Sequence, residues 1–272
     1  MKISHESPLS LMPQSRKYND YDYALVHLFE EKPEYYEFFK ESVEQGRHVL
    51  LDNSIFELGV SFDPVKYATW ISKLKPTEYI IPDVLEDAIG TMDKALDWKE
   101  NQMLVLKEEL PEVKSIGVVQ GKTYNELVQC YQYMDDVIEV DKIAISFDYS
   151  YYQKVCPHPN KWMAFTLGRI KTLTRMLNDR IINKDKLHHL LGCALPIEFF
   201  FYREGFEWIE TIDTSSPIVH GLCNIVYEPG GIINKQSIKL VDLIDSTPTI
   251  EQVDKINWNI SVFRSYVNGM TA

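Results

Sequence analysis

The sequence predicts an α/β protein of the (β/α)8, TIM-type barrel class, formed as a single domain over residues 1–272. Short apolar runs alternate with longer amphipathic segments from about residue 24 to residue 213, which is typical of strands and helices around a parallel sheet. Hydrophobic residues make up 45% of the chain and charged residues 25%, both ordinary values for globular proteins. No linker, low-complexity tract or internal repeat divides the chain, and we expect the barrel core over about 24–227.

Seven apolar runs are short enough to be buried strands of such a barrel. They are residues 24–28, 49–51, 79–81, 116–119, 143–145, 190–191 and 208–212. The eighth strand is less distinct, and residues 224–227 are the candidate. Residues 247–268 predict a helix that closes the barrel at its C-terminal side.

Signals for helix ends lie between these runs and support the alternation. A proline start or a capping side chain is expected at the beginning of a helix, and a glycine just after its end. The signals are Pro33 with Gly46, Asp63 before Pro64, and Thr123 three residues before Glu126.

Polar side chains follow five of the seven predicted strands. In a barrel the carboxyl ends of the strands converge on one face, where active sites are built. The alternative for each residue is that it marks the end of a strand or caps the next helix. The residues are Asp52, Asp83, Gln120, Ser146 with Asp148, and Asp213.

The charge distribution is uneven along the chain. Lys and Arg number 28 and Asp and Glu number 40, a net charge of −12 that argues against a surface that binds nucleic acid everywhere. Residues 161–191 nevertheless carry seven basic side chains and two acidic ones. The spacing of Ile170, Leu173, Leu177 and Ile181 predicts a helix with its basic side chains on the outer face. This face is either solvated or contacts a polynucleotide backbone through Arg169, Lys171, Arg175 and Arg180.

Metal and cofactor motifs are absent from the sequence. Cys130, Cys156, Cys193 and Cys223 lie too far apart for a structural zinc site, and we expect buried, reduced thiols. The adjacent His188 and His189 point to opposite faces of a strand, so we expect one inside the barrel and one outside. Residues 117–123 are one residue too short for a phosphate-binding loop. We therefore expect no metal and no cofactor.

The N-terminus lacks the apolar region of a signal peptide. No run approaches the ~18 uninterrupted apolar residues of a membrane helix. We expect a cytoplasmic protein that does not contact a membrane.

An ordered set of short motifs resembles the tRNA-guanine transglycosylase family. The motifs are Leu51-Asp52-Asn53-Ser54, Pro82-Asp83, Val118-Val119-Gln120-Gly121, Leu191-Gly192, the run from Glu210 to Pro217 that contains Asp213, and His220-Gly221. The resemblance implies that Asp213 is the nucleophile and Asp52 the general acid/base. It also implies that Asp83 and Gln120 read the exchanged base, with Gly121, Ser146 and Gly192 around it.

The sequence departs from that family at three places. Asn53-Ser54-Ile55 replaces a Ser-Gly-Gly segment, and Lys122 replaces the second glycine after Val-Gln-Gly. The zinc-binding cysteine cluster near the C-terminus is absent. This short, zinc-free form is similar to relatives that exchange or remove bases in DNA.

The expected activity is therefore cleavage of an N-glycosidic bond in DNA. A carboxylate such as Asp213 attacks C1′, and a second group such as Asp52 manages the proton of the departing base. A free nucleobase or water completes the reaction, which is either base exchange by a transglycosylase (a glycosyltransferase) or hydrolysis by a DNA glycosylase. The alternatives are a transglycosylase acting on tRNA and a non-catalytic barrel that binds nucleic acid or protein.

Overall fold

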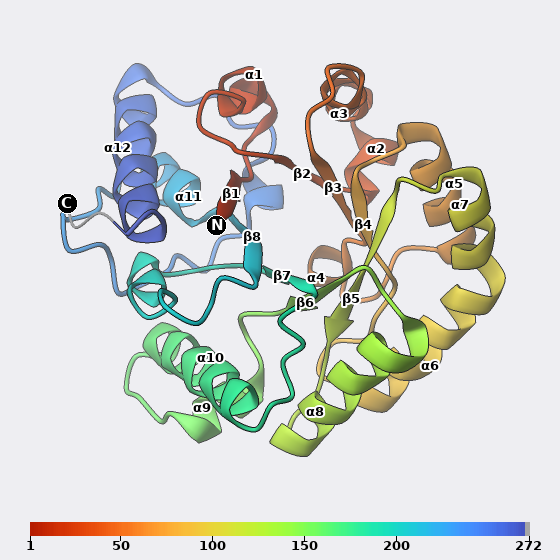
Figure 1. The fold of residues 1–272 in the computed structure, drawn as a ribbon. Coiled ribbons are helices and arrows are strands. Elements are labelled where there is room, and N and C mark those ends of the chain that lie inside the picture. Colours follow the sequence, from red (N-terminus) through yellow and green to blue (C-terminus); the bar gives the residue numbers. More distant parts are fainter. Residues whose placement is uncertain (270–272) are drawn as a thin grey trace.

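A computed structural model describes residues 1–269 of the chain and consists of eight parallel strands with helices around them (Figure 1). The strand order is β1-β8-β7-β6-β5-β4-β3-β2, and the predicted (β/α)8 class is confirmed. The strands are β1 (Lys2–His5), β2 (Asp22–Leu25), β3 (Val49–Asp52), β4 (Glu78–Ile80), β5 (Lys114–Val119), β6 (Lys142–Ile145), β7 (Leu187–Leu190) and β8 (Ile209–Thr214).

The eighth strand is β1, and the candidate at residues 224–227 is wrong. Strand β1 pairs in parallel with β8, with Ser4 opposite Asp213. Its four residues include one strongly apolar side chain, Ile3, so a search for apolar runs overlooks it. Residues 224–227 do not form a strand because Asn224 has a positive φ of 62° and the N–H of Tyr227 donates to a side chain, Asn259 Oδ1, at 2.7 Å.

Strands β1 and β2 do not form a ladder, so the barrel has one seam. Loop residues bridge this seam. The backbone N–H of His5 donates to Asn19 Oδ1 at 2.7 Å, and Asn19 Nδ2 donates to the carbonyl of His5 at 3.0 Å. The Tyr21 hydroxyl donates to the carbonyl of Ile212 on β8 at 2.8 Å. These contacts fix β1 beside β2 without strand pairing.

Most of the helices lie outside the sheet and cover its strands, whereas the short α4 (Ile55–Leu58) lies near the centre of the view (Figure 1). The other helices are α1 (Met12–Ser15), α2 (His27–Glu31), α3 (Pro33–Glu44), α5 (Pro64–Leu74), α6 (Ala88–Trp98), α7 (Leu104–Glu109), α8 (Tyr124–Gln132), α9 (Ser150–Val155), α10 (Lys161–Asn178), α11 (Ser216–Leu222) and α12 (Ile250–Val267). No helix among residues 1–269 has the length and apolar character needed to cross a bilayer.

The predicted helix ends are largely confirmed. Pro33 begins α3, and Asp63 Oδ1 accepts the N–H of Lys66 at the start of α5. Thr123 caps α8, although the Glu126 side chain accepts from the N–H of Lys122 instead of completing a capping box. The closing helix α12 begins at Ile250, three residues later than predicted, because Thr249 caps it.

An ion network closes the amino end of the barrel. Lys142 is 1% exposed, and its Nζ lies 2.5 Å from Glu78 Oε1 and 2.7 Å from Glu210 Oε2. Burial opposes the charged form of Glu78, but His48 and Lys142 outweigh it and lower the pKa of Glu78 to about 2. Because this end is filled, a ligand must enter from the carboxyl ends of the strands.

Candidate active site

A cavity of about 470 Å³ opens at the carboxyl ends of the strands. Its walls come from strand ends and from the loops that follow them, as in other barrels of this class. Six of the seven residues predicted to form the catalytic and substrate-binding site line this cavity. They are Asp52, Asp83, Gln120, Ser146, Gly192 and Asp213.

Asp213 lies near the end of β8 and is 4% exposed. Its Oδ1 accepts the N–H of Gly192 at 3.0 Å and lies 3.1 Å from His189 Nε2. The other nitrogen of His189, Nδ1, lies 3.0 Å from Thr211 Oγ1, which fixes the ring plane. The Gly192 N–H also lies 3.2 Å from Oδ2, so this N–H is shared between the two carboxylate oxygens while His189 lies beside Oδ1.

The two adjacent histidines of β7 point to opposite faces, as predicted. His189 points into the barrel toward Asp213, whereas His188 packs outside between Tyr131 and Trp208. Both are 0% exposed because helices cover the outer face of the sheet. Burial lowers the pKa of His188 to about 4. The sequence did not identify His189 as a site residue, although it lies on a predicted strand three residues before Gly192, where it contacts Asp213.

Asp52 ends β3 and is 7% exposed. Tyr23 donates its hydroxyl to Asp52 Oδ2 at 2.8 Å, and the N–H of Ser54 donates to Oδ1 at 2.6 Å. Burial, with the charge of Glu57 adding to it, raises the pKa of Asp52 well above its usual range. The Tyr23 ring stacks on His189 with centroids 6.0 Å apart, so one aromatic pair connects the surroundings of Asp52 and Asp213.

Asp83 forms a buried cluster with two amides. Asn53 Nδ2 donates to Oδ1 at 2.8 Å, and Gln120 Nε2 donates to Oδ2 at 2.7 Å. Gln120 Oε1 accepts the N–H of Glu86 at 2.9 Å, so both ends of this amide are engaged. Burial raises the pKa of Asp83, and the two amide donors reduce that rise. Gln120 therefore orients Asp83 as well as lining the cavity.

Asn53 and Ser54 form the turn that follows Asp52. Asn53 Oδ1 accepts the N–H of Ile55 at 3.0 Å while its amide nitrogen fixes Asp83. Ser54 has a φ of 61°, in the left-handed region that glycine adopts without strain. The turn after Asp52 thus keeps a glycine-like backbone although no glycine is present.

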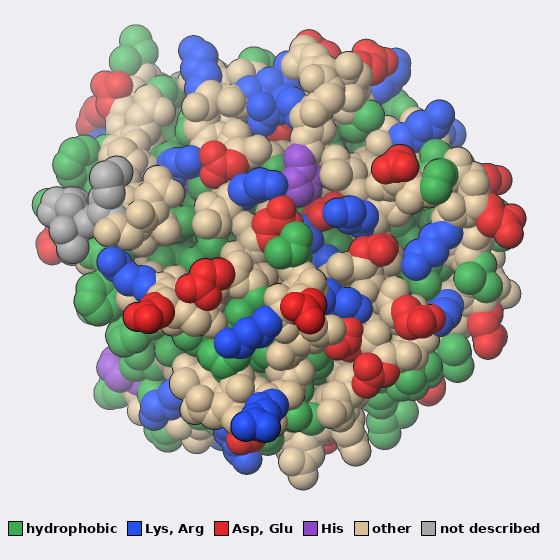
Figure 2. Space-filling model, viewed as in Figure 1, with side chains coloured by type: hydrophobic (Ala, Val, Ile, Leu, Met, Phe, Trp, Pro, Cys, Tyr) green, Lys and Arg blue, Asp and Glu red, His purple; other side chains and the backbone are tan. Residues whose placement is uncertain are grey.

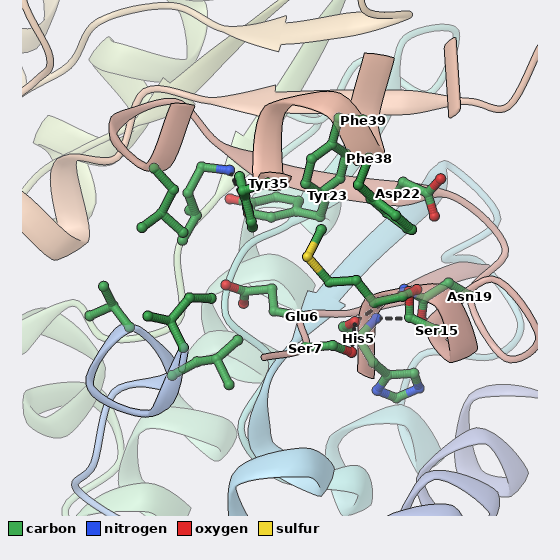
Figure 3. Close-up of a pocket in the computed structure, with 16 residues that line it drawn as sticks. His5, Glu6, Ser7, Ser15, Asn19, Asp22, Tyr23, Tyr35, Phe38 and Phe39 are labelled. Carbon is green, nitrogen blue, oxygen red and sulfur yellow. Dashed lines mark hydrogen bonds between the residues drawn. The ribbon is translucent and has the colours of Figure 1, made fainter. Parts of the chain in front are cut away.

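Two further acids line the cavity that the sequence analysis did not identify. Glu6 follows β1, and it also lines a smaller pocket at the seam, where its side chain points away from His5 (Figure 3). Burial and the nearby Asp213 raise the pKa of Glu6. Burial raises the pKa of Glu57 to about 6. Glu6 follows directly on β1, so recognising that strand was the signal needed to find it.

The glycines predicted for the site have different roles. Gly192 lines the cavity and has a φ of 64°. Its backbone N–H donates a hydrogen bond to Asp213. Gly121 does not line the cavity, which corrects its expected contact with the substrate. A Cβ at Gly121 would lie 2.8 Å from the Cβ of Glu126, so this glycine allows α8 to start close to β5.

Arg169 cannot contact a phosphate, which corrects its assignment to a nucleic-acid surface. Its side chain is 0% exposed and forms a bidentate ion pair with Glu198, at 2.7 and 2.8 Å. The buried stripe of α10 is rotated relative to the predicted one because Gly168 allows this helix to pack closely on Tyr152. Arg169 therefore belongs to the packing between α10 and the segment after β7.

The other predicted backbone contacts are exposed but far from the cavity. Lys161 and Trp162, at the start of α10, line the cavity, and a rise of 1.5 Å per residue puts Arg175 roughly 20 Å along the helix from them. Arg175 also stacks on Tyr124 and pairs with Asp179. On the face in Figure 2, basic and acidic side chains are interspersed instead of forming a single-sign patch.

The part of the chain that the structure describes contains no group of three or more His, Cys, Asp or Glu side chains suited to a metal ion. All four cysteines are free thiols. Cys130 and Cys193 are buried as predicted, whereas Cys156 and Cys223 are half-buried.

The fold and the site define a class: a parallel barrel with an acidic, largely enclosed cavity at its strand ends. Comparison with models of protein families and with curated proteins gave no match to this chain.

Proposed function

We propose that this protein cleaves the N-glycosidic bond between a nucleobase and DNA, with Asp213 as nucleophile and Asp52 as proton donor. The observation that supports this most directly is the contrast between two carboxyl groups that line one cavity. Burial and the charge of Glu57 raise the pKa of Asp52, whereas Asp213 has the ring of His189 at 3.1 Å from its Oδ1. Two titratable groups with different environments are the usual basis for dividing nucleophilic and acid roles.

In the first step a carboxylate oxygen of Asp213 forms a bond to C1′ as the bond between C1′ and the base nitrogen breaks. The electron pair of the broken bond goes to the base, which takes the proton from Asp52. In the second step a free nucleobase or water attacks C1′ and displaces Asp213, and its proton returns to Asp52. An incoming base gives exchange with retained configuration, and water gives hydrolysis.

The cavity suits a nucleobase that has left the base stack. Its volume of about 470 Å³ lies within the ~300–1,000 Å³ of small-molecule sites. The cluster of Asp83 with Gln120 presents oriented polar groups deep in this space, as needed to recognise the polar edge of a flipped base. Phe56 also lines the cavity and is 46% exposed, so it is available to stack near the entrance.

We favour DNA as the polymer because the chain resembles the short, zinc-free relatives and lacks the zinc-binding cysteine cluster of the tRNA-directed enzymes. A transglycosylase acting on tRNA and a non-catalytic binding barrel are the other candidates. The residues proposed for the reaction are the same for DNA and tRNA, so the polymer is decided by experiment.

The test is to incubate the protein with DNA and, separately, with tRNA, with and without a mixture of radiolabelled free nucleobases. We expect label incorporation or alkali-labile abasic sites in DNA. The Asp213→Asn variant preserves size but removes the attacking charge, so turnover is abolished while polymer binding survives. Full activity of Asp213→Asn contradicts the nucleophile assignment. Activity on tRNA alone selects the alternative, and binding without base release or exchange selects the non-catalytic barrel.

A further inference from the structure

Two lysines from distant parts of the chain meet over one indole ring at the cavity. Lys161 is the first residue of α10, and Lys235 lies in the segment between α11 and α12. Their Nζ atoms lie 4.5 Å and 5.6 Å from the centroid of Trp162. Lys235 Nζ also lies 6.0 Å from the ring of Phe147, which stacks on Trp162 at 6.2 Å. All four side chains line the cavity, so the pair is part of its wall.

Asn160 fixes the two lysines relative to each other. Its Oδ1 accepts the N–H of Trp162 at 2.9 Å and so caps α10. Its Nδ2 donates to the carbonyl of Ile233 at 2.8 Å and to Asn234 Oδ1 at 2.9 Å. One side chain therefore attaches the segment that carries Lys235 to the start of the helix that carries Lys161.

The positive charge at this place is not neutralised by a direct ion pair. Among residues 1–269, neither Lys161 nor Lys235 has a carboxylate within 4.0 Å, whereas Lys142 and Lys186 each have one at 2.7 Å or less. Lys161 also stands in the first turn of an 18-residue helix, where a cation opposes the helix dipole and no acidic residue offsets it. Unpaired cations at a helix N-terminus destabilise a folded protein, and locally unfavourable arrangements of this kind are common at binding sites.

We propose that Lys161 and Lys235 bind a phosphodiester group of the polynucleotide, next to the nucleotide whose base occupies the cavity. Two ammonium groups supply the charge and several donors that phosphate oxygens accept. The Trp162 and Phe147 rings beneath them exclude water from one side. The site rests on the proposed function for the identity of its ligand, and it replaces the outer face of α10 as the phosphate contact.

The acids of the cavity are compatible with a nearby phosphate. Burial raises the pKa values of Glu6 and Asp52, which reduces the negative charge that the phosphate meets. Burial also lowers the pKa of Lys235, and an anion at this place favours its charged form. Lys161 and Lys235 thus provide a local positive charge in the cavity wall that attracts a phosphate, although the net charge of the protein is −12.

The test compares Lys161→Gln/Lys235→Gln with a control, Lys171→Gln/Lys184→Gln, that removes two exposed charges, one in the middle of α10 and one after its end. Fluorescence anisotropy measures binding of a single-stranded oligodeoxynucleotide of mixed sequence and of a base-free deoxyribose-phosphate oligomer, over a range of salt concentrations. We expect the first variant to bind both probes more weakly and to reduce the slope of log K against log salt by about 0.7 per lost contact. The control matches the wild type, and Lys161→Arg/Lys235→Arg restores most of the slope.

The outcomes separate this site from the proposed function. An unchanged salt slope in the Gln variant, or an equal loss in the control, overturns the phosphate site even if DNA bases are released or exchanged. A wild-type protein that binds neither probe overturns it as well. Weaker binding of the Gln variant in a protein without base release or exchange supports the phosphate site and contradicts the proposed reaction.

Discussion

Asp52 and Asp213 are both aspartates of one cavity, but different neighbours surround their carboxyl groups. Asp213 is oriented by the backbone N–H of Gly192, which both carboxylate oxygens share, and by His189 beside its Oδ1. Asp52 accepts from Tyr23 and from a backbone N–H, yet burial and Glu57 outweigh these donors. In the proposed reaction, Asp52 therefore supplies the proton that the departing base needs.

Replacing Asp52 with Asn tests that assignment. The amide keeps the hydrogen-bonding size but cannot deliver a proton, so the step that requires proton transfer slows by about 10²–10⁴-fold. Single-turnover kinetics with DNA measures this loss, and denaturing electrophoresis reveals a covalent adduct at Asp213 if the second step is slowed more than the first. Activity within twofold of the wild type assigns the proton donor to another group. Glu6 is the next candidate, because it lines the same cavity and burial also raises its pKa.

Replacing Tyr23 with Phe shifts the pH dependence without removing the acid. The Tyr23 hydroxyl lowers the pKa of Asp52 by donating to it, so its loss raises that pKa further. A general acid works while protonated and loses activity as pH rises through its pKa, so the alkaline limb of kcat/KM moves to higher pH. If the alkaline limb of kcat/KM does not move, the pKa that it reports does not belong to Asp52.

At the scale of elements, α10 joins the site to the core. Its first turn carries Lys161 and Trp162 into the cavity wall, while Arg169 two turns later is buried against Glu198. Tyr202 donates to Glu198 Oε1 at 2.7 Å, and Arg169 Nη1 donates to the carbonyl of Leu191 at 2.8 Å. The helix is thereby attached to the loop after β7, which supplies Gly192 to the site.

Arg169→Ala is expected to destabilise the protein instead of weakening DNA binding selectively. Removing one partner leaves the carboxylate of Glu198 buried and unpaired, which costs about 3–5 kcal/mol. Urea unfolding followed by circular dichroism measures the change in the free energy of unfolding. Arg169→Met/Glu198→Leu removes both charges and is expected to recover most of that loss. If Arg169→Ala leaves stability unchanged and lowers affinity for DNA, the buried pair does not stabilise α10.

Seven strands were predictable because each contains a short apolar run, and most of the cavity-lining acids and amides were predictable because polar residues follow five of those runs. The eighth was not, since Lys2–His5 takes its burial from pairing with β8, whose paired residues lie 209 positions later, and not from its own apolar character. Arg169 and Glu198 were unpredictable for the same reason: the ion pair exists only in the folded chain. Lys235 lies in a loop without periodicity, and its place over Trp162 depends on Asn160.

At the scale of the whole molecule, buried histidines make stability depend on pH. Burial lowers the pKa of His5 from 6.5 to about 3, and neither of its ring nitrogens has a hydrogen-bond partner in the described residues. The unfolded chain therefore binds a proton near pH 6.5 that the folded protein does not bind until about pH 3. The stability associated with neutral His5 is present above pH 6.5 and is lost as pH falls toward 3.

His5→Phe is expected to remove this dependence, because the ring packs edge-on against Tyr18 and Phe263 and needs no polar partner. Urea unfolding at several pH values gives the difference in free energy of unfolding between variant and wild type. That difference grows in favour of the variant by about 1.4 kcal/mol per pH unit between pH 6 and pH 4. Taking a difference cancels the opposite contribution of the buried acids, which gain stability as pH falls. A difference that does not vary with pH contradicts the lowered pKa.

The pairing of the first strand with the last also has a consequence for biosynthesis. A ribosome adds about 5–20 residues per second, so roughly 10–40 s pass between the synthesis of β1 and that of β8. During that interval Ile3 has no strand to pair with, and Glu6 and Asp213 cannot yet share a cavity. The nascent chain therefore brings Glu6 and Asp213 into one cavity only at the end of translation, so the proposed reaction cannot begin until the barrel is complete.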